Sequence, residues 1–196
     1  CHHPTRRANG AELDATHSRG ARRRASRSRP PASSRNACGA SRATSSRGTR
    51  STDCGVTWSN PAKLSERIAL NQGTVLAINP VDGSIYIAWR EFTNPADPAA
   101  VHSILFVRST DGGKSFTKAA PIDAALRPYD QGTSSVSFRT NAYPTMAVDG
   151  AGRIYVAWAA RGFAPDNPDP VVGDARIVMS TSFDGGTSWS MPPRRL

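Results

Sequence analysis

The sequence lacks several features that would assign it to common classes of protein. No apolar run reaches the length of a signal peptide or a membrane-spanning helix, so we expect no membrane partner. Apolar residues at helical spacing are also missing, which argues against a helical fold. Cysteine is scarce, and the spacing of Cys1, Cys38 and Cys54 predicts neither a zinc site nor a disulfide framework.

The first 50 residues have no Lys, Ile, Val, Met, Phe, Tyr or Trp and a single Leu, Leu13. They contain twelve Arg and two acidic residues, so the net charge of +10 belongs to this segment and the rest of the chain is neutral. Because such a segment buries too little to offset the cost of ordering its backbone, we expect residues 1–50 to form a disordered tail.

The tail could neutralise phosphates, as basic arms of nucleic-acid-binding proteins do. No aromatic residue interrupts it and no binding module follows it, so we expect no nucleic-acid partner. The alternatives are a linker, a truncation, or a translation that runs past the true start, because the chain opens on Cys1 rather than Met.

One short pattern occurs three times, as "STDCGVTW" at 51–58, "STDGGKSF" at 109–116 and "SFDGGTSW" at 182–189. We call these segments the Asp corners. An Asp side chain at this place accepts backbone N–H groups and closes a turn, and the following glycines supply positive φ. We expect the aromatic residue at the end of each corner to pack beneath the turn; these residues are Trp58, Phe116 and Trp189.

A longer unit surrounds the second and third corners. "VLAINPVDGSIYIAWREF" begins at Val75 and "PTMAVDGAGRIYVAWAARG" begins at Pro144, each with two apolar strands around an Asp-Gly turn. A third strand, the corner and a fourth strand follow. Two four-stranded antiparallel units, at about 74–122 and 143–193, plus one extra strand from Thr57 predict an all-β, partial β-propeller over residues 51–196. A β-sandwich is the alternative, but it does not need the same corner in each unit.

The pattern S-x-D-G-G-x-T/S-W/F between the third and fourth strands resembles the Asp-box of the sialidase (bacterial neuraminidase repeat) family over residues 51–193. The resemblance implies a six-bladed propeller, of which this chain would be a piece that lacks the remaining blades and is inactive alone. It also implies an exo-α-sialidase type of glycosidase, a glycan substrate and a secreted or extracellular location.

Long charged loops all leave the end of the sheets opposite to the Asp corners, and functional residues concentrate on such loops. We therefore expect the corners to stabilise the fold. The family uses arginines to grip the substrate carboxylate, an Asp acid/base and a Tyr nucleophile. By order and spacing, the resemblance implies substrate contacts at Arg139 and Arg161 and an acid/base at Asp166. Arg90 and Glu91 occupy the equivalent place in the preceding unit and are a second candidate pair for substrate contact.

For the nucleophile, Tyr143 and Tyr129 are unrepeated and lie near this end, whereas the repeated Tyr86 and Tyr155 are expected to pack. Neither candidate has a persuasive Glu beside it, and we take Tyr143 as the candidate. Ordinary loop roles remain open for every residue of this set. We expect no cofactor and no metal, since the acids near Asp166 lack the ligand spacing of a calcium loop.

Two other functions remain open. One is a non-catalytic Asp-box propeller that binds glycans or proteins as a scaffold. The other is a propeller that acts on a different substrate, because a fold does not fix a function.

Overall fold

The strands of each repeated unit form one sheet. The computed structural model describes residues 45–67, 69–94, 100–130, 140–190 and 194–195, so most of the predicted tail lies outside the described residues. The first sheet contains β3 (Leu70–Ile78), β4 (Ile85–Phe92), β5 (His102–Ser109) and β6 (Ala120–Leu126), in that order. The second contains β7 (Thr145–Val148), β8 (Ile154–Ala160), β9 (Arg176–Ser182) and β10 (Arg194–Arg195), also in chain order.

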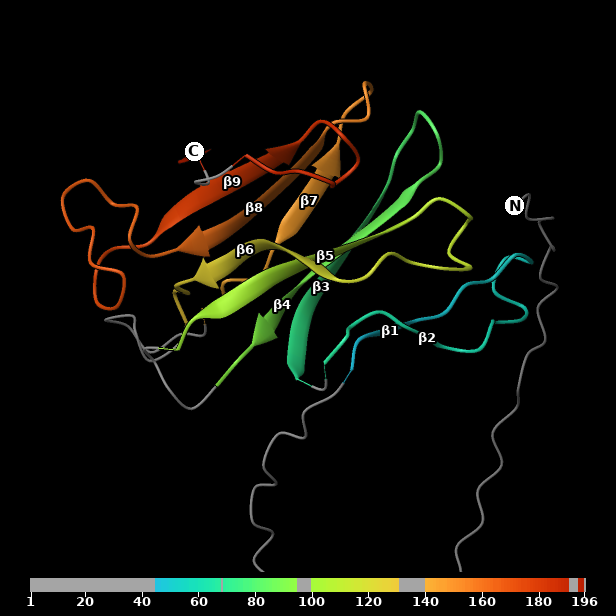
Figure 1. The fold of residues 1–196 in the computed structure, drawn as a ribbon, viewed down its shortest axis with the longest axis horizontal. Helices are drawn as coiled ribbons and strands as arrows, with labels where there is room; N and C mark the ends of the chain where they lie inside the picture. Colours follow the sequence, from blue (N-terminus) through green and yellow to red (C-terminus); the bar gives the residue numbers. More distant parts are fainter. Residues whose placement is uncertain (1–44, 68, 95–99, 131–139, 191–193, 196) are drawn as a thin grey trace, which may run out of the picture. The chain divides into compact units, whose positions relative to one another are not determined.

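All strand pairs in both sheets are antiparallel. The two predicted four-stranded units are therefore confirmed as two blades of a partial β-propeller (Figure 1). The first blade begins at Leu70 rather than near residue 74, because β3 continues to pair with β4 on both sides of the bulge between Gln72 and Val75. No helix occurs among the described residues, and hence none that could cross a membrane.

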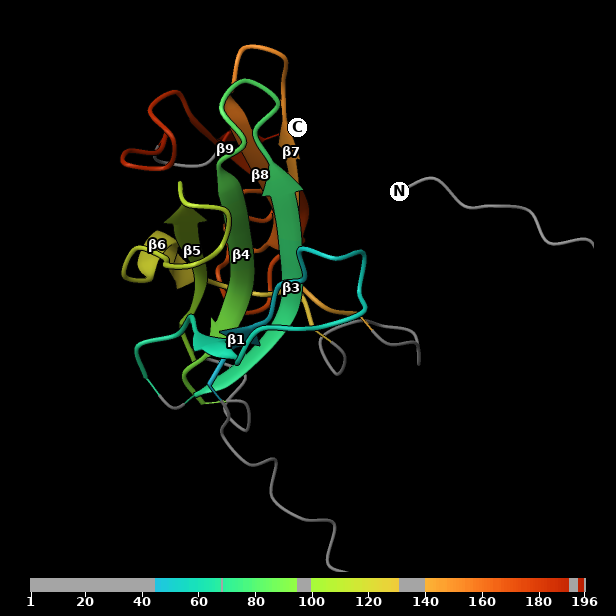
Figure 2. The same cartoon turned by 90° about the vertical axis from the view of Figure 1, so that its right-hand side faces the viewer.

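The extra strand is shorter than expected. Two short strands, β1 (Arg47–Gly48) and β2 (Ala62–Lys63), flank the first Asp corner and pair as a two-stranded antiparallel ribbon. Strand β1 falls inside the segment predicted as a tail, so pairing begins ahead of residue 51. Figure 2 shows this ribbon beside the end of the first blade at which β3 begins and β4 ends.

The main core lies between the two blades. Strand β8 alternates buried and half-buried residues, and its buried side chains include Val156 and Trp158. They belong to one cluster with Tyr86, Ile104 and Phe106 of the first blade. Burying one such side chain contributes about 1.5–3 kcal/mol, so this alternation fixes which face of each sheet meets the other.

The first blade is buried on its other face as well. Ile87, Trp89, Leu105 and Val107 form a second cluster with Leu64, which follows β2. Since both faces of β4 are covered, six consecutive residues of this strand are buried. The second blade, in contrast, exposes Ile177 on its outer face.

The three Asp corners share one hydrogen-bond network. In the third, Ser182 Oγ donates to Asp184 Oδ1 at 2.8 Å and accepts from the Gly186 amide at 2.8 Å. Ser188 donates its amide to Oδ1 at 2.9 Å and its hydroxyl to Oδ2 at 2.6 Å. The same bonds join Asp53 to Ser51 and Thr57, with Gly55, and Asp111 to Ser109 and Ser115, with Gly113.

The corners lie at the end of the blades where the β3–β4 and β7–β8 turns also lie (Figure 1). The aromatic residues at their ends behave differently. Trp189 contacts Phe106 edge-on, with 5.1 Å between ring centroids, and Phe116 packs on the second cluster. The prediction for Trp58 is wrong: this residue is 63% exposed, because the two-residue strands of the ribbon offer no sheet on which it could pack.

Cys54 takes the place of the first glycine in its corner. It has φ of 59°, close to the 69° and 70° of Gly112 and Gly185 at the equivalent places. This is the left-handed conformation that residues other than glycine adopt at a cost. Cys54 is also disulfide-bonded, which the cysteine spacing did not predict.

Candidate functional site

Polar side chains from both blades meet at the end opposite to the Asp corners. We call Gln72, Arg90, Tyr129, Asp130, Tyr143 and Arg161 together the loop-end cluster. Gln72 lies near the start of β3 and Arg90 near the end of β4, and these two residues are direct partners across the strands. The other members lie on the segments after β6, before β7 and after β8.

Arg90 is the buried centre of this cluster. Its side chain is fully buried, and its two terminal nitrogens donate to the two carboxylate oxygens of Asp130 at 2.6 and 2.7 Å. Such a two-pronged pair fixes the direction of the carboxylate as well as its position. The side chain of Asp130 is 29% exposed, so the arginine is hidden and the aspartate reaches the surface.

An aromatic ring covers the Arg90 guanidinium, which lies 3.9 Å from the centre of the Phe92 ring. His102 approaches this ring edge-on, with 5.1 Å between ring centroids. His102 is 3% exposed. Burial, and then the positive charge of Arg90, lower the pKa of His102 from 6.5 to about 4, so this ring is neutral at pH 7 and adds no second cation beside Arg90.

Tyr143 reaches the bulge of β3 from the segment before β7. Its hydroxyl donates to Gln72 Oε1 at 2.5 Å, and its ring is half-buried. Gly73 makes the approach possible, because a Cβ at this position would lie 2.6 Å from Cδ1 of Tyr143. The neighbouring amide of Ala142 donates to Asp130 at 3.3 Å, which links Tyr143 to the arginine pair.

Arg161 is held from the other side. It is 4% exposed, donates through Nη1 to the carbonyl of Gly173, and lies 4.7 Å from the centre of the Tyr129 ring. Its amide donates to the carbonyl of Arg127 at 2.8 Å. The structure therefore brings together three of the five predicted site residues, Arg90, Arg161 and Tyr143, through the short segment that carries Tyr129 and Asp130.

The remaining two predicted residues are not part of the cluster as described. Asp166 is exposed on the loop after β8, whereas the nearby Asp169 closes a turn by accepting the amides of Val171 and Val172 at 2.7 and 2.8 Å. Arg139 lies outside the described residues.

Asp130 is the functional candidate that the sequence did not reveal. It lies beside Tyr129 in "LRPYDQG", far along the chain from Arg90, and only the return of the chain after β6 makes them partners. The only sequence feature that pointed to Asp130 as a site residue was its position on a loop at the loop-rich end. No group of three or more potential metal-binding side chains forms within the ranges that the structure describes.

The arrangement can hold a polar ligand rather than transfer a group unaided. It offers a fixed and partly exposed carboxylate and a half-buried tyrosine whose hydroxyl is bonded to an amide. These are suitable hydrogen-bond donors and acceptors for a hydroxyl-rich ligand.

Comparison with protein-family models gives no match for this chain, and comparison with curated proteins gives none either. Among solved structures, Hadza microbial sialidase Hz136 matches with 15% identity and a TM-score of 0.46, over 72% of this chain and 29% of that one. A protein of unknown function from Dyadobacter fermentans matches with 23% identity and a TM-score of 0.45, over 74% of this chain and 42% of that one. The chain thus spans less than half the length of either structure.

Proposed function

We propose that this chain is part of a sialidase-like Asp-box propeller of the exo-α-sialidase type, whose loop-rich end binds the terminal sialic acid of a glycan. The observation that supports this most is the identical network in all three corners, centred on Asp53, Asp111 and Asp184. Such corners stabilise one end of each blade and leave the other end, with the loop-end cluster, for a ligand.

In this proposal Arg139 binds the substrate carboxylate, since a guanidinium binds a carboxylate through two parallel bonds and keeps its charge at neutral pH. Arg161 is 4% exposed, so it contributes to substrate contact by holding the Tyr129 ring and the loop that carries Gly173. Arg90 is fully buried on Asp130, so it contributes to substrate contact by orienting that carboxylate. Asp166, exposed on its loop, is the proposed acid/base. The remaining blades belong to the rest of a larger ring, and a glycan substrate fits a secreted location.

Tyr143 is the proposed nucleophile of the complete enzyme. A phenol that attacks the sugar must lose its proton, and sialidases are the glycosidases that use tyrosine for this step. Here the hydroxyl donates to the amide oxygen of Gln72, and an amide accepts a hydrogen bond without taking the proton.

This contact favours a second candidate function, a non-catalytic propeller that binds glycans. The same surface would then hold the sugar, and no group in the described part of the cluster would need to accept a proton from Tyr143. The two functions differ in turnover and agree in binding.

The test combines saturation-transfer NMR with sialyllactose and hydrolysis of a fluorogenic sialoside, both with the full-length protein that contains the remaining blades. We expect sialyllactose to bind and lactose not to bind, and Arg161→Ala to weaken binding at least tenfold. Arg153→Ala is the matched control, because Arg153 is 51% exposed at the opposite end. Hydrolysis that Tyr143→Phe or Asp166→Ala abolishes supports the enzyme, and binding without hydrolysis supports the scaffold. Equal binding of lactose would indicate a different substrate and overturn the proposal.

A further inference from the structure

The first blade carries a cavity on the face that points away from the loop-end cluster. Its volume is about 410 Å³, and its walls come from β4, β5, β6 and the segment before β3. Arg90 and Glu91 are consecutive on β4, and successive side chains of a strand point to opposite faces of its sheet. The cavity that Glu91 lines is therefore separate from the cluster that Arg90 centres.

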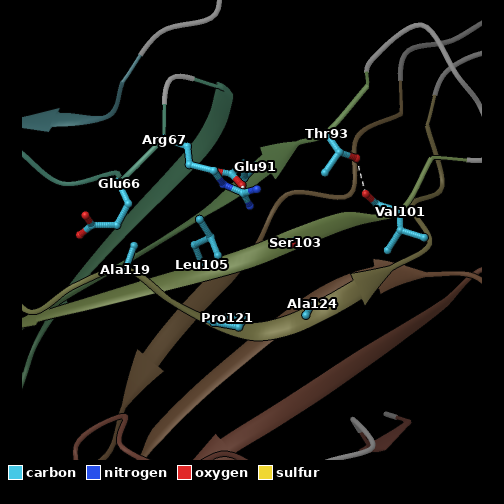
Figure 3. A pocket seen from close by; sticks show the side chains of 10 residues that line it. All are labelled: Glu66, Arg67, Glu91, Thr93, Val101, Ser103, Leu105, Ala119, Pro121 and Ala124. Carbon is cyan, nitrogen blue, oxygen red and sulfur yellow. Dashed lines mark hydrogen bonds and ion pairs between the residues drawn. The ribbon is translucent and has the colours of Figure 1, made fainter.

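A buried carboxylate lies in this cavity. Glu91 is 2% exposed, and its Oε1 accepts from Nη2 of Arg67 at 2.7 Å. The Arg67 side chain is 71% exposed, and its guanidinium group points toward Glu91 (Figure 3). A buried charge must be kept paired, and the group that pairs Glu91 here is the end of a largely exposed side chain.

The rest of the lining is suited to a short apolar stem. Leu105 and Pro121 lie along the wall, with Val101 and Ala124 toward one end (Figure 3). Glu66 adds a second negative charge at the rim, with its carboxylate turned away from Glu91 (Figure 3). The charges on the lining side chains sum to −1, so the cavity attracts a cation.

We propose that this cavity binds a guanidinium group on a short aliphatic stem, either a free alkylguanidine or the side chain of an arginine in a peptide. The incoming guanidinium replaces Arg67 on Glu91, and its stem lies along Leu105 and Pro121. Arg67 is the internal stand-in for this ligand, since it already presents the required group to the carboxylate. Glu91 stays paired throughout this exchange. The entropy cost of ordering the ligand is partly offset, because the Arg67 side chain regains its freedom in solvent.

The proposal is tested by chemical rescue of the full chain, followed by thermal unfolding. Arg67→Ala leaves Glu91 buried and unpaired, so its melting temperature falls. Agmatine should restore it in a saturable way, and acetyl-Gly-Arg-Gly-amide tests whether a peptide side chain does the same. Butylamine, which has the charge without the planar fork, should restore less.

The matched control is the double variant Arg67→Ala/Glu91→Gln, which lacks the carboxylate and should not respond to agmatine. An equal response in both variants would overturn the proposal, and so would no response in Arg67→Ala. A second variant, Ala124→Trp, keeps the ion pair between Arg67 and Glu91 and narrows the cavity from an exposed strand position. Its folding does not depend on agmatine. It should abolish the chemical-shift changes that agmatine causes in NMR spectra of the wild type; unchanged shifts would also overturn the proposal. None of these readouts uses a sialoside, so this proposal and the proposed function can fail separately.

Discussion

Asp130 accepts hydrogen bonds from both terminal nitrogens of the fully buried Arg90, at 2.6 and 2.7 Å, while its own side chain stays 29% exposed. The pair joins the end of β4 to the segment after β6. It thereby fixes a partly exposed carboxylate at the loop-rich end of the first blade. This asymmetry between a hidden cation and an accessible anion leads to the first prediction.

Removing the anion should cost more stability than removing the cation. Asp130→Asn leaves a fully buried guanidinium without its counter-charge, and breaking a buried pair in this way costs about 3–5 kcal/mol. Arg90→Met leaves a carboxylate that water already reaches, so we expect a smaller loss. Urea unfolding of both variants measures the difference. Equal losses, or a larger loss for Arg90→Met, would contradict the asymmetric environment of the pair.

Gly73 and Tyr143 should be energetically coupled. Gly73→Ala places a methyl group 2.6 Å from Cδ1 of Tyr143 at a φ of +67°, so we expect a loss of about 1–3 kcal/mol from overpacking in addition to about 1–2 kcal/mol from the left-handed backbone. In the Tyr143→Gly background the ring and the Cβ of residue 143 are both absent, so the clash is gone and only the backbone cost remains. A double-mutant cycle measures the coupling, and strictly additive losses would show that the two residues do not press on each other.

The third Asp corner should lose its contribution to stability in acid. Hydrogen bonds from Ser188 and then Ser182 lower the pKa of Asp184 from 3.8 to about 2. The carboxylate therefore stabilises the fold above pH 3.8, and this contribution is lost as the pH falls toward 2. Asp184→Asn cannot accept the Ser188 hydroxyl at Nδ2, so its melting temperature should lie below that of the wild type at pH 6. The gap should narrow at pH 2, and a gap that is constant with pH would contradict this explanation.

His102 should make stability depend on pH in a higher range. Its folded pKa of about 4 lies below the ordinary 6.5, so the unfolded chain takes up a proton first as the pH falls. Stability is then full above pH 6.5 and decreases down to pH 4. We expect the unfolding free energy of His102→Gln to depend less on pH between pH 4 and 6.5 than that of the wild type. An unchanged slope in this variant would show that another group titrates there.

Much of the fold could be predicted because its signals are local. The period-two alternation in "IYIAW" and "IYVAW" predicted the buried strands β4 and β8, and each Asp corner closes with bonds inside eight residues. The failure at Trp58 is also instructive. Its corner follows the pattern, but packing needs a sheet beneath the turn, and the ribbon β1–β2 does not supply one.

The candidate site was predictable only in its location. The sequence indicated the loop-rich end and named Arg90, Arg161 and Tyr143, but their partners come from distant segments. Arg90 and Asp130 are 40 residues apart, and Tyr143 and Gln72 are 71 apart. The alternation of apolar and polar residues along a strand does not indicate which loop packs against which strand.

By itself, the sequence determined the corners, the strand faces and the end of the blades that carries the long loops, because each follows from hydrogen bonds or side-chain alternation between near neighbours. Only the tertiary structure decided that Arg90 is hidden behind Asp130, that Tyr143 bonds to an amide at the β3 bulge, and that Glu91 opens into a cavity covered by Arg67. Burial and pairing of charged groups depend on which surfaces meet in space, and this is settled only when the blades pack.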